Sequence, residues 1–455
     1  MATKRKSRPA AGAELARTLA ARIAAGRARI GVIGLGYVGL PLACLFAEKG
    51  FPATGFDIDL QKTAKLAAGR SYIRHIPGRR IAPLVKAGKL SASSDFSRLK
   101  QMDAIVICVP TPLSRQREPD LSFVAATARE IGRHLRRGQL VVLESSTYPG
   151  TTEEVVKPAL EARGMQSGRD FFLAYSPERE DPGNEQFGTA AIPKVVGGDG
   201  KLALDLALSL YNAAVVKTVP ASSPATAEAV KLTENIFRSV NIALVNELKV
   251  IFDAMGIDVW EVIDAAKTKP FGFMPFYPGP GLGGHCIPID PFYLTWKARE
   301  FGIATRFIEL AGEINTAMPR YVVDRLIAAL NERAGKALKG ARILIVGLAY
   351  KKNVDDMRES PALTLIDMLE ALGARVDYHD PIITAVKPSR EHPHLAGRRS
   401  VALNAANLKR ADAVLIVTDH DSIDYRAIGK GAKLILDTRN CMARAGWRGR
   451  NVIKA

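Results

Sequence analysis

The stretch that decides the fold is RIGVIGLGYVGLPLACLFAEKG, residues 29–50. It opens with an apolar, β-branched run of the length of a buried strand, and residues 40–49 have the composition of a helix. Between them, residues 34–39 read GLGYVG and supply the glycines of a tight turn. A strand, a glycine-rich turn and a helix in this order predict the first unit of a dinucleotide-binding domain.

Each glycine of this turn has a separate physical role. Gly34 permits the tight turn, Gly36 lets a pyrophosphate approach the backbone because it has no Cβ, and Gly39 lets the helix pack on the strand. Asp57 ends a second expected strand, 53–58, where a carboxylate can bind ribose hydroxyls and repel a 2′-phosphate. The pattern therefore predicts NAD rather than NADP. The expected cofactor contacts are Gly34, Gly36, Tyr37, Val38, Gly39 and Asp57.

The alternation of strands and helices continues through MDAIVICVP (102–110) and QLVVLESS (139–146), which predicts a mainly parallel, doubly wound sheet. A similar series recurs near the C-terminus as ARILIVGLAY (341–350), ARVDYHD (374–380), ADAVLIVTDH (411–420) and KLILDTRN (433–440). We interpret this recurrence as a second Rossmann-like domain, with chance similarity among buried strands as the alternative. Only Gly347 stands at the matching turn, so a second dinucleotide is not expected.

A long helix is expected between the two halves. Residues 224–256 carry apolar side chains at three- and four-residue spacing, with no internal proline or glycine after Pro224. We expect it to act as a linker and dimerisation element, with a helical pair within one chain as the alternative. The predicted fold is α/β, with two Rossmann-like doubly wound domains joined by this helix and a helical middle domain. The expected parts are a leader helix (1–27), an NAD-binding domain (28–218), a central helical domain (219–335) and a C-terminal domain (336–455).

The composition is strongly basic. Lys and Arg number 64 against 46 Asp and Glu, which gives a net charge of +18. This balance favours partners that carry phosphate groups, with ordinary solubility as the alternative. Because the charges are dispersed and aromatic residues make up only 7%, we expect no nucleic-acid partner. No uninterrupted apolar stretch has the length of a membrane-spanning helix, so no membrane partner is expected either.

The four cysteines are far apart and form no CxxC pair: Cys44, Cys108, Cys286 and Cys441. Such spacing fits neither a disulfide framework nor a structural zinc site, so no metal is expected. With no secretory signal at the N-terminus, we expect a cytoplasmic protein. Cys44 and Cys108 fall in a helix and an apolar strand, where buried and inert thiols are expected.

Cys286 lies in a different setting, the loop PGPGLGGHCIPIDP at 278–291. The backbone amides of such a glycine-rich loop can surround an anion or a sugar. From spacing alone, Cys286 is either a nucleophile or a small packed residue. Asp290 either lies near the thiol or caps the helix that follows it. The neighbouring His285 is interpreted as structural.

The long helix also carries candidate site residues. Lys231 and Asn235 are four residues apart and therefore share one helix face, either as a functional pair or as a surface pair. Glu228 and Glu234 are assigned to other faces or to salt pairing.

A series of motifs resembles one known family. In the order seen in the UDP-glucose/GDP-mannose dehydrogenase family, the chain carries GLGYVG, VPTP, SSTYPGT, YSPER, KLTENIFRSVNIALVNE, GLGGHCIPIDP, GLAYKKNVDDMRES and DTRN. The resemblance extends from residue 28 to the C-terminus. Residues 271–298 are similar to the branch that oxidises UDP-N-acetylhexosamines. Ile289 and Pro182 stand where UDP-glucose enzymes usually have a lysine and a glutamate.

The resemblance implies a four-electron oxidation of the C6 alcohol of a UDP-sugar to a uronic acid, with two NAD per turnover, to supply polysaccharide precursors. UDP-N-acetylglucosamine is the preferred substrate, with UDP-N-acetylmannosamine, UDP-N-acetylgalactosamine and UDP-glucose as alternatives. In the family's reaction the Cys286 thiolate adds to the intermediate aldehyde, and the thioester formed next is hydrolysed. The catalytic residues carried over are Cys286, Lys231, Asn235, Asp290, Glu178 and Thr147.

The resemblance also implies a role for each of these residues. Lys231 would lower the pKa of the thiol and, with Asn235, stabilise negative charge on the C6 oxygen. Asp290 and Thr147 match water-orienting groups, and Glu178 matches a carboxylate placed near the same centre. Which group removes the first proton is left open.

The same resemblance assigns the binding residues. Thr111 and Thr147 would border the nicotinamide, and Arg358 would reach the NAD pyrophosphate. The residues implied to hold the UDP-sugar are Glu178, Lys231, Gly281, Gly283, Gly284, Tyr350, Lys351 and Arg439. The expected partners are a UDP-sugar and further copies of the chain, as a homodimer or a higher homo-oligomer.

One rival function is a two-electron hydroxyacid dehydrogenase that uses lysine in place of cysteine. It would account for the 34–39 turn and for Lys231, but neither for Cys286 nor for the C-terminal domain.

Overall fold

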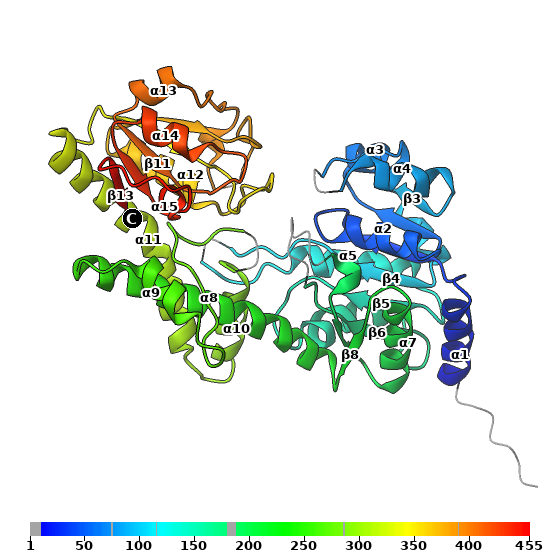
Figure 1. Ribbon diagram of the computed structural model, residues 1–455. Helices are drawn as coiled ribbons and strands as arrows, with labels where there is room; N and C mark the ends of the chain where they lie inside the picture. The colour runs from blue at the N-terminus through cyan, green and yellow to red at the C-terminus, as the bar shows by residue number, and fades with distance from the viewer. Residues whose placement is uncertain (1–10, 74–75, 115, 180–187, 285–286, 390) are drawn as a thin grey trace, which may run out of the picture. The chain divides into compact units, whose positions relative to one another are not determined.

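The computed structural model describes residues 11–455 apart from residues 74–75, 115, 180–187, 285–286 and 390 and the side chain of residue 189 (Figure 1). The chain forms two compact units. Unit 1 comprises Met1–Glu234 with Phe292–Ile303, and unit 2 comprises Asn235–Pro291 with Ala304–Ala455. Along the chain, the helices α8 (Pro224–Ala254) and α10 (Asp290–Arg299) each run from one unit into the other.

Unit 1 is built on one eight-stranded sheet with the strand order β3-β2-β1-β4-β5-β6-β7-β8. Its strands are β1 (Ile30–Ile33), β2 (Ala53–Phe56), β3 (Leu90–Ser93), β4 (Ala104–Ile107), β5 (Leu140–Leu143), β6 (Phe172–Tyr175), β7 (Lys194–Gly198) and β8 (Thr218–Ala221). Neighbouring strands pair in parallel except β6 and β7, which are antiparallel. The strand order reverses between β1 and β4, the point at which doubly wound sheets bind ligands. The predicted α/β doubly wound fold is therefore confirmed.

The central strands of this sheet are buried on both faces. Val32 of β1 and Val106 of β4 belong to one buried cluster, whereas their neighbours Ile33 and Ile107 belong to another. Successive side chains of a strand point to opposite faces, so a strand covered on both sides needs apolar residues throughout. This explains why the predicted strands are uninterrupted apolar runs.

The remaining helices of unit 1 are α1 (Ala11–Ala24), α2 (Gly39–Glu48), α3 (Leu60–Ala67), α4 (Gly78–Lys86), α5 (Ser122–His134), α6 (Lys157–Glu161) and α7 (Lys201–Asn212). The first of them, α1, buries Ala16, Leu19 and Ile23 in the same cluster as Val32. Arg22 on this helix forms an ion pair with the buried Asp103, with 2.8 Å between nitrogen and oxygen. Helix α1 is therefore an integral part of the core of unit 1.

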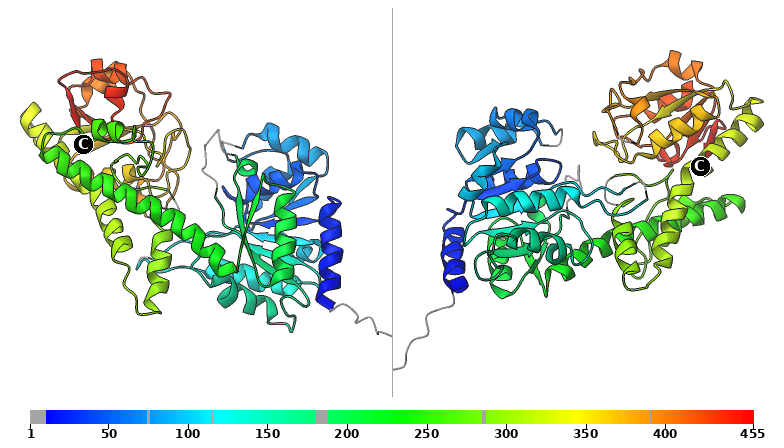
Figure 2. Two further views of the ribbon diagram at one scale, coloured as in Figure 1. Left: turned by 60° about the horizontal axis from the view of Figure 1, so that its bottom comes forward. Right: turned by 180° about the vertical axis from the view of Figure 1, so that it is seen from behind.

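Unit 2 holds a second sheet, entirely parallel, with the order β10-β9-β11-β12-β13. Its strands are β9 (Arg342–Val346), β10 (Arg375–His379), β11 (Ala413–Ile416), β12 (Ile435–Asp437) and β13 (Val452–Lys454). Its helices besides α8 are α9 (Val259–Ala266), α11 (Arg306–Ala334), α12 (Pro361–Ala371), α13 (Ala405–Arg410), α14 (Tyr425–Gly431) and α15 (Cys441–Arg444). Separate buried clusters cover the two faces of this sheet, and α8 and α11 are the two long helices (Figure 2). None of the helices in the described ranges has both the length and the apolar character that crossing a bilayer requires.

The two sheets repeat one detail of backbone geometry. Gly34 and Gly347 have φ angles of +90° and +88°, and each donates its N–H over 2.8 Å to the last carbonyl of the following strand. The residue after each glycine donates its N–H to the carboxylate that ends that strand, Asp57 in unit 1 and Asp380 in unit 2. This correspondence supports the interpretation of a repeated unit.

Candidate active site

The glycine-rich turn of unit 1 has the geometry that its sequence predicts. A Cβ on Gly34 would lie 2.5 Å from the carbonyl oxygen of Cys108, and a Cβ on Gly39 would lie 1.9 Å from that of Gly34. At Gly36, by contrast, no atom lies within 4 Å of where a Cβ would stand, so a ligand can approach the backbone there. Helix α2 follows with Val38 at its N-cap and no side chain capping it, as a phosphate-binding helix requires. These residues fit a dinucleotide.

Asp57 is buried at the carboxyl end of β2. Its Oδ2 accepts the N–H of Leu35 over 2.9 Å, and its Oδ1 accepts the N–H of Asp59 over the same distance. Lys62 lies 3.3 Å from Oδ2. The backbone thus orients the carboxylate, and Oδ1 retains a lone pair with which it can accept a ribose hydroxyl.

Thr111 and Thr147 follow the carboxyl ends of β4 and β5, and both side chains are buried. Within the described part of the chain, the hydroxyl of Thr147 has no hydrogen-bond partner. Since buried hydroxyls are normally paired, this one marks a position that a ligand can complete. The two threonines lie at the sheet edge where parallel α/β sheets bind their ligands, as the resemblance implied.

Glu228 on α8 holds the turn that follows Thr147. Its carboxylate accepts the N–H of Gly150 over 2.6 Å and both the N–H and the hydroxyl of Thr152, over 2.9 and 2.6 Å. Burial raises the pKa of Glu228 to about 7. The assignment of Glu228 to another face or to a salt pair is wrong: it lies seven residues before Asn235, and therefore on nearly the same face, and it bonds the backbone.

The structure brings together two predicted site residues of unit 1. Lys231 is buried, and its Nζ donates to the main-chain oxygen of Glu178 over 2.6 Å. The next residue of the same segment, Arg179, forms an ion pair with Glu234 at 2.5 Å, in agreement with the predicted salt pairing of Glu234. Helix α8 is thus attached to the YSPER segment at two consecutive residues.

A buried polar cluster supports this segment, and sequence analysis missed it. Lys194 on β7 donates to Glu144 Oε2 over 2.9 Å and to the carbonyl oxygen of Pro177 over 3.2 Å. The hydroxyl of Tyr211 donates to the other oxygen of Glu144. Burial raises the pKa of Glu144; burial alone would lower that of Lys194, but the carboxylates of Glu144 and Glu178 raise it. The cluster holds the residue directly before Glu178.

In unit 2, Asn235 and Asp290 are in direct contact. The amide nitrogen of Asn235 donates to Asp290 Oδ2 over 2.5 Å, and Arg238 donates to the amide oxygen of Asn235 over 2.5 Å. Asn235 and Asp290 are both buried, and Asp290 begins α10. The structure thus brings these two predicted site residues together.

Cys286 and His285 lie outside the described residues. Of the other three cysteines, Cys44 and Cys441 are buried and Cys108 is half-buried. The prediction that Cys108 is a fully buried thiol is therefore wrong: the residue stands just past the end of β4, where the sheet opens towards the glycine-rich turn.

The glycine-rich loop before Cys286 packs against predicted substrate residues. A Cβ on Gly283 or Gly284 would lie 2.7 or 2.8 Å from the side chain of Tyr350, and Gly281 has a φ of +138°. The N–H of Gly284 donates to the carbonyl oxygen of Arg358 over 3.0 Å. The loop thus contacts Tyr350 in unit 2, and two groups of predicted substrate residues lie together. The exposed Arg358 side chain is paired with Asp356, with 2.6 Å between Nη2 and Oδ2.

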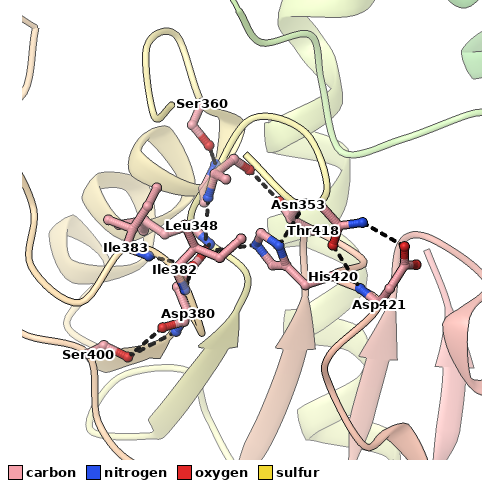
Figure 3. Close-up of polar contacts among 12 residues, drawn as sticks. Leu348, Asn353, Ser360, Asp380, Ile382, Ile383, Ser400, Thr418, His420 and Asp421 are labelled. Carbon is pink, nitrogen blue, oxygen red and sulfur yellow. Dashed lines mark hydrogen bonds and ion pairs between the residues drawn. The ribbon is translucent and has the colours of Figure 1, made fainter. Parts of the chain in front are cut away.

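A second carboxylate network shapes the turn that carries Tyr350 and Lys351 (Figure 3). Asp380 accepts backbone N–H groups from Leu348, Ala349, Ile382 and Ile383 at 2.6 to 3.1 Å. It also accepts the Nε2–H of His420 over 3.0 Å, while His420 Nδ1 accepts the N–H of Asn353 over 3.0 Å. Burial alone would raise the pKa of Asp380, but these donors lower it to about 2. The turn is therefore held at both ends.

Three family models match the chain with this geometry. They describe the NAD binding domain (residues 28–215), the central domain (225–317) and the UDP binding domain (344–444) of the UDP-glucose/GDP-mannose dehydrogenase family. The chain belongs to this family. It is therefore an NAD-dependent nucleotide-sugar dehydrogenase, and the glycine-rich turn of unit 1 lies within the matched NAD-binding domain.

Several similar proteins are named as dehydrogenases of N-acetylated sugars. The chain is 39% identical to a UDP-N-acetyl-D-glucosamine 6-dehydrogenase of Pseudomonas aeruginosa, over 80% of its own length and 85% of that protein. It is 36% identical to a UDP-N-acetyl-D-mannosamine dehydrogenase of Pyrococcus horikoshii, over 90% and 95%. A solved structure described as UDP-D-ManNAc dehydrogenase from the same organism superimposes with a TM-score of 0.84 at 35% identity, over 94% of this chain and 98% of that one.

Proposed function

We propose that the protein oxidises the C6 alcohol of a UDP-N-acetylhexosamine to the uronic acid, with UDP-N-acetylglucosamine as its substrate. The observation that carries the proposal is the arrangement along α8. Lys231 is buried one helical turn before Asn235, and Asn235 bonds Asp290, four residues after Cys286. A buried ammonium one helical turn from an amide that bonds a carboxylate suits the oxidation through a covalent intermediate that we propose for Cys286. The 39% identity to a UDP-N-acetyl-D-glucosamine 6-dehydrogenase supports the choice of sugar.

The proposed reaction has three stages. The C6 alcohol first loses its hydroxyl proton and a hydride from C6, which gives an aldehyde. The Cys286 thiolate then adds to the aldehyde carbon, and the thiohemiacetal loses a second hydride to become a thioester. Water hydrolyses the thioester, which releases the uronate and restores the thiol. NAD, when bound, accepts the hydride in each of the two oxidations.

The chain's own groups act on charge and on water. Lys231 supplies a positive charge that lowers the thiol pKa and stabilises the developing C6 oxyanion. Asn235 donates a second hydrogen bond to the same oxygen, and Asp290 orients the hydrolytic water with Thr147. Glu178 is the further carboxylate of the centre. The base that removes the first proton is Asp290, Thr147 or Glu178.

We further propose that the enzyme is a homodimer that works in the cytoplasm and supplies polysaccharide precursors. Phe237, Leu244 and Ile251 on α8 are 48%, 50% and 46% exposed and follow one another at seven-residue intervals. Seven residues are nearly two helical turns, so the three side chains form one apolar stripe that a second copy can cover. The free thiols of Cys44 and Cys441 support a reducing compartment.

The decisive experiment measures NADH released per sugar with a panel of UDP-sugars. Two equivalents with UDP-N-acetylglucosamine are expected, and weaker turnover with the N-acetylmannosamine, N-acetylgalactosamine and glucose analogues. One equivalent per sugar would favour the rival two-electron dehydrogenase. Preference for UDP-N-acetylmannosamine, the sugar named for the Pyrococcus relative, would correct the sugar alone.

A further inference from the structure

Lys249 is a buried cationic side chain that the proposed reaction does not use. It lies on α8 and is only 3% exposed. Its Nζ has no hydrogen-bond partner among the described residues, and it stands 5.5 Å from the centre of the Tyr321 ring on α11. An isolated ammonium is expensive to bury, so buried lysines are normally paired or neutral. Lys249 therefore lacks the partner that such a position requires.

The charged groups that face Lys249 come from three elements: Asp253 on α8, Arg325 on α11, and Asp437 and Arg439 at the end of β12. Both carboxylates are bonded elsewhere. Asp253 accepts hydrogen bonds from Tyr321 and Arg325 over 2.9 and 3.3 Å, and Asp437 accepts two backbone N–H groups. Burial, and after it the Arg439 guanidinium, lower the pKa of Lys249 to about 7.

Arg439 is a second unsatisfied cation at the same place. Its Nε donates to the carbonyl oxygen of Val417 over 2.9 Å, and its terminal nitrogens make no hydrogen bond within the described ranges. A Cβ on Gly279 would lie 2.6 Å from one of those nitrogens, so the guanidinium packs directly against the backbone of this loop. The N–H of Gly279 donates over 3.0 Å to Asn246, one turn before Lys249 on α8. The loop thus ties Arg439 to the helix that carries Lys249.

We propose that Lys249 and Arg439 together bind the diphosphate of the nucleotide substrate. A buried lysine and a half-buried arginine, neither with a carboxylate partner among the described residues, are complementary to a doubly charged anion, and each phosphate oxygen offers the acceptor that Lys249 lacks. The inference rests on the proposed function and adds to it a residue of the central domain. Arg439 lies within the matched UDP-binding domain, whereas Lys249 lies outside it.

This arrangement couples substrate binding to protonation. A lysine with a pKa of about 7 is about nine-tenths neutral at pH 8 and becomes charged when a phosphate binds beside it. Binding should therefore take up about 0.9 proton at pH 8. The terminal phosphate of UDP, with a pKa of about 6, is already ionised at that pH and contributes little.

The test is calorimetric titration of UDP into the full-length protein at pH 8, in two buffers of different ionisation enthalpy. Lys249→Met is expected to abolish the proton uptake and to weaken UDP binding about tenfold or more. Lys249→Gln provides a second, polar replacement. The matched control Lys409→Met removes an exposed lysine from α13 and should change neither quantity. Unchanged NAD binding reports that the variants are folded.

Two results would overturn the inference while the proposed function stands. One is UDP binding by the unmodified protein without proton uptake, and the other is equal affinity and equal uptake in Lys249→Met. UDP that fails to bind the unmodified protein at all would overturn the proposed function together with the role of Lys249.

Discussion

The ammonium group of Lys231 donates a hydrogen bond to the main-chain oxygen of Glu178 over 2.6 Å. Lys194 holds the preceding carbonyl, that of Pro177, in the same way. A carboxylate would neutralise the charge of the lysine. A carbonyl oxygen orients the ammonium group and leaves its charge in place. In the described part of the chain this is the one hydrogen bond of Lys231, so its other two N–H groups remain for a substrate oxygen.

Lys231→Met should lower kcat by about 10² to 10³, because it removes a positive charge aimed at the developing oxyanion. UDP binding should be retained. The control is Glu234→Gln, which breaks the neighbouring ion pair with Arg179 and should leave kcat within about twofold. Steady-state NADH formation checks both variants. A kcat of Lys231→Met within tenfold of the unmodified enzyme would contradict this role.

Cys286→Ser should abolish uronate formation and leave the fold intact, since a serine hydroxyl is a much weaker nucleophile than a thiolate. Product analysis checks the loss of uronate formation, and circular dichroism checks that the fold is intact. The control is Cys44→Ala, because burial raises the pKa of the Cys44 thiol to about 11 and makes it unreactive. A normal NADH yield from Cys286→Ser would refute the thioester step.

Asp57→Asn should weaken NAD binding about tenfold, because the ribose hydroxyls lose a charged acceptor. The discrimination against NADP should fall at the same time, since an amide does not repel a 2′-phosphate. Fluorescence titration with both cofactors measures the effect. Asp59→Asn is the control: Asp59 caps α3, where asparagine caps equally well. An unchanged NAD affinity in Asp57→Asn would remove the residue from the cofactor site.

Glu228 should make stability depend on pH. Its pKa is raised from 4.5 to about 7 in the fold, so the folded state binds a proton more tightly than the unfolded state does. The corresponding stability is fully present below pH 4.5 and is lost as the pH rises through 7. Between pH 5 and 8, the unmodified protein should therefore lose about 2 kcal/mol more unfolding free energy than Glu228→Gln. Denaturant unfolding across that range checks this; parallel pH profiles would contradict it.

Leu244→Glu should convert the proposed dimer into a monomer, because it places a charge in the centre of the exposed stripe on α8. Sedimentation velocity measures the mass. The control is Leu372→Glu, a change at another exposed leucine of unit 2, 42% accessible and outside the stripe. A dimer that survives the change at Leu244 would show that this face is not the interface.

Sequence patterns predicted the elements whose signals are local. The glycine-rich turn and the strands around it depend on residues adjacent in the chain, and each observed strand among them lies inside its predicted segment. The proximity of Asn235 and Asp290 could be expected from the sequence because both residues belong to motifs of one family. The short strands β3, β6, β7, β8 and β13 were not predicted.

The missed site residues depend on contacts between distant segments. Glu144 forms hydrogen bonds with Lys194 and Tyr211, which are 50 and 67 residues away in the sequence. The charge of a residue in a predicted strand does not indicate which distant residue it will pair with. Glu228 accepts hydrogen bonds from the backbone of a turn 76 to 78 residues away. Because every residue except proline has a backbone N–H, such donors cannot be identified from residue types. Lys249 has no such partner at all within the described residues, and only its burial distinguishes it from a surface lysine.

The repeated carboxylate position has a consequence for redesign. Asp57 accepts two backbone N–H groups and keeps capacity for a ligand, whereas Asp380 is filled by four backbone donors and an imidazole. Introducing a three-glycine motif after β9 would therefore not create a second coenzyme site. The carboxylate that would have to bind the ribose, that of Asp380, already accepts hydrogen bonds from the protein. The carboxylate of unit 1 can still accept a ligand, whereas that of unit 2 has a purely structural role.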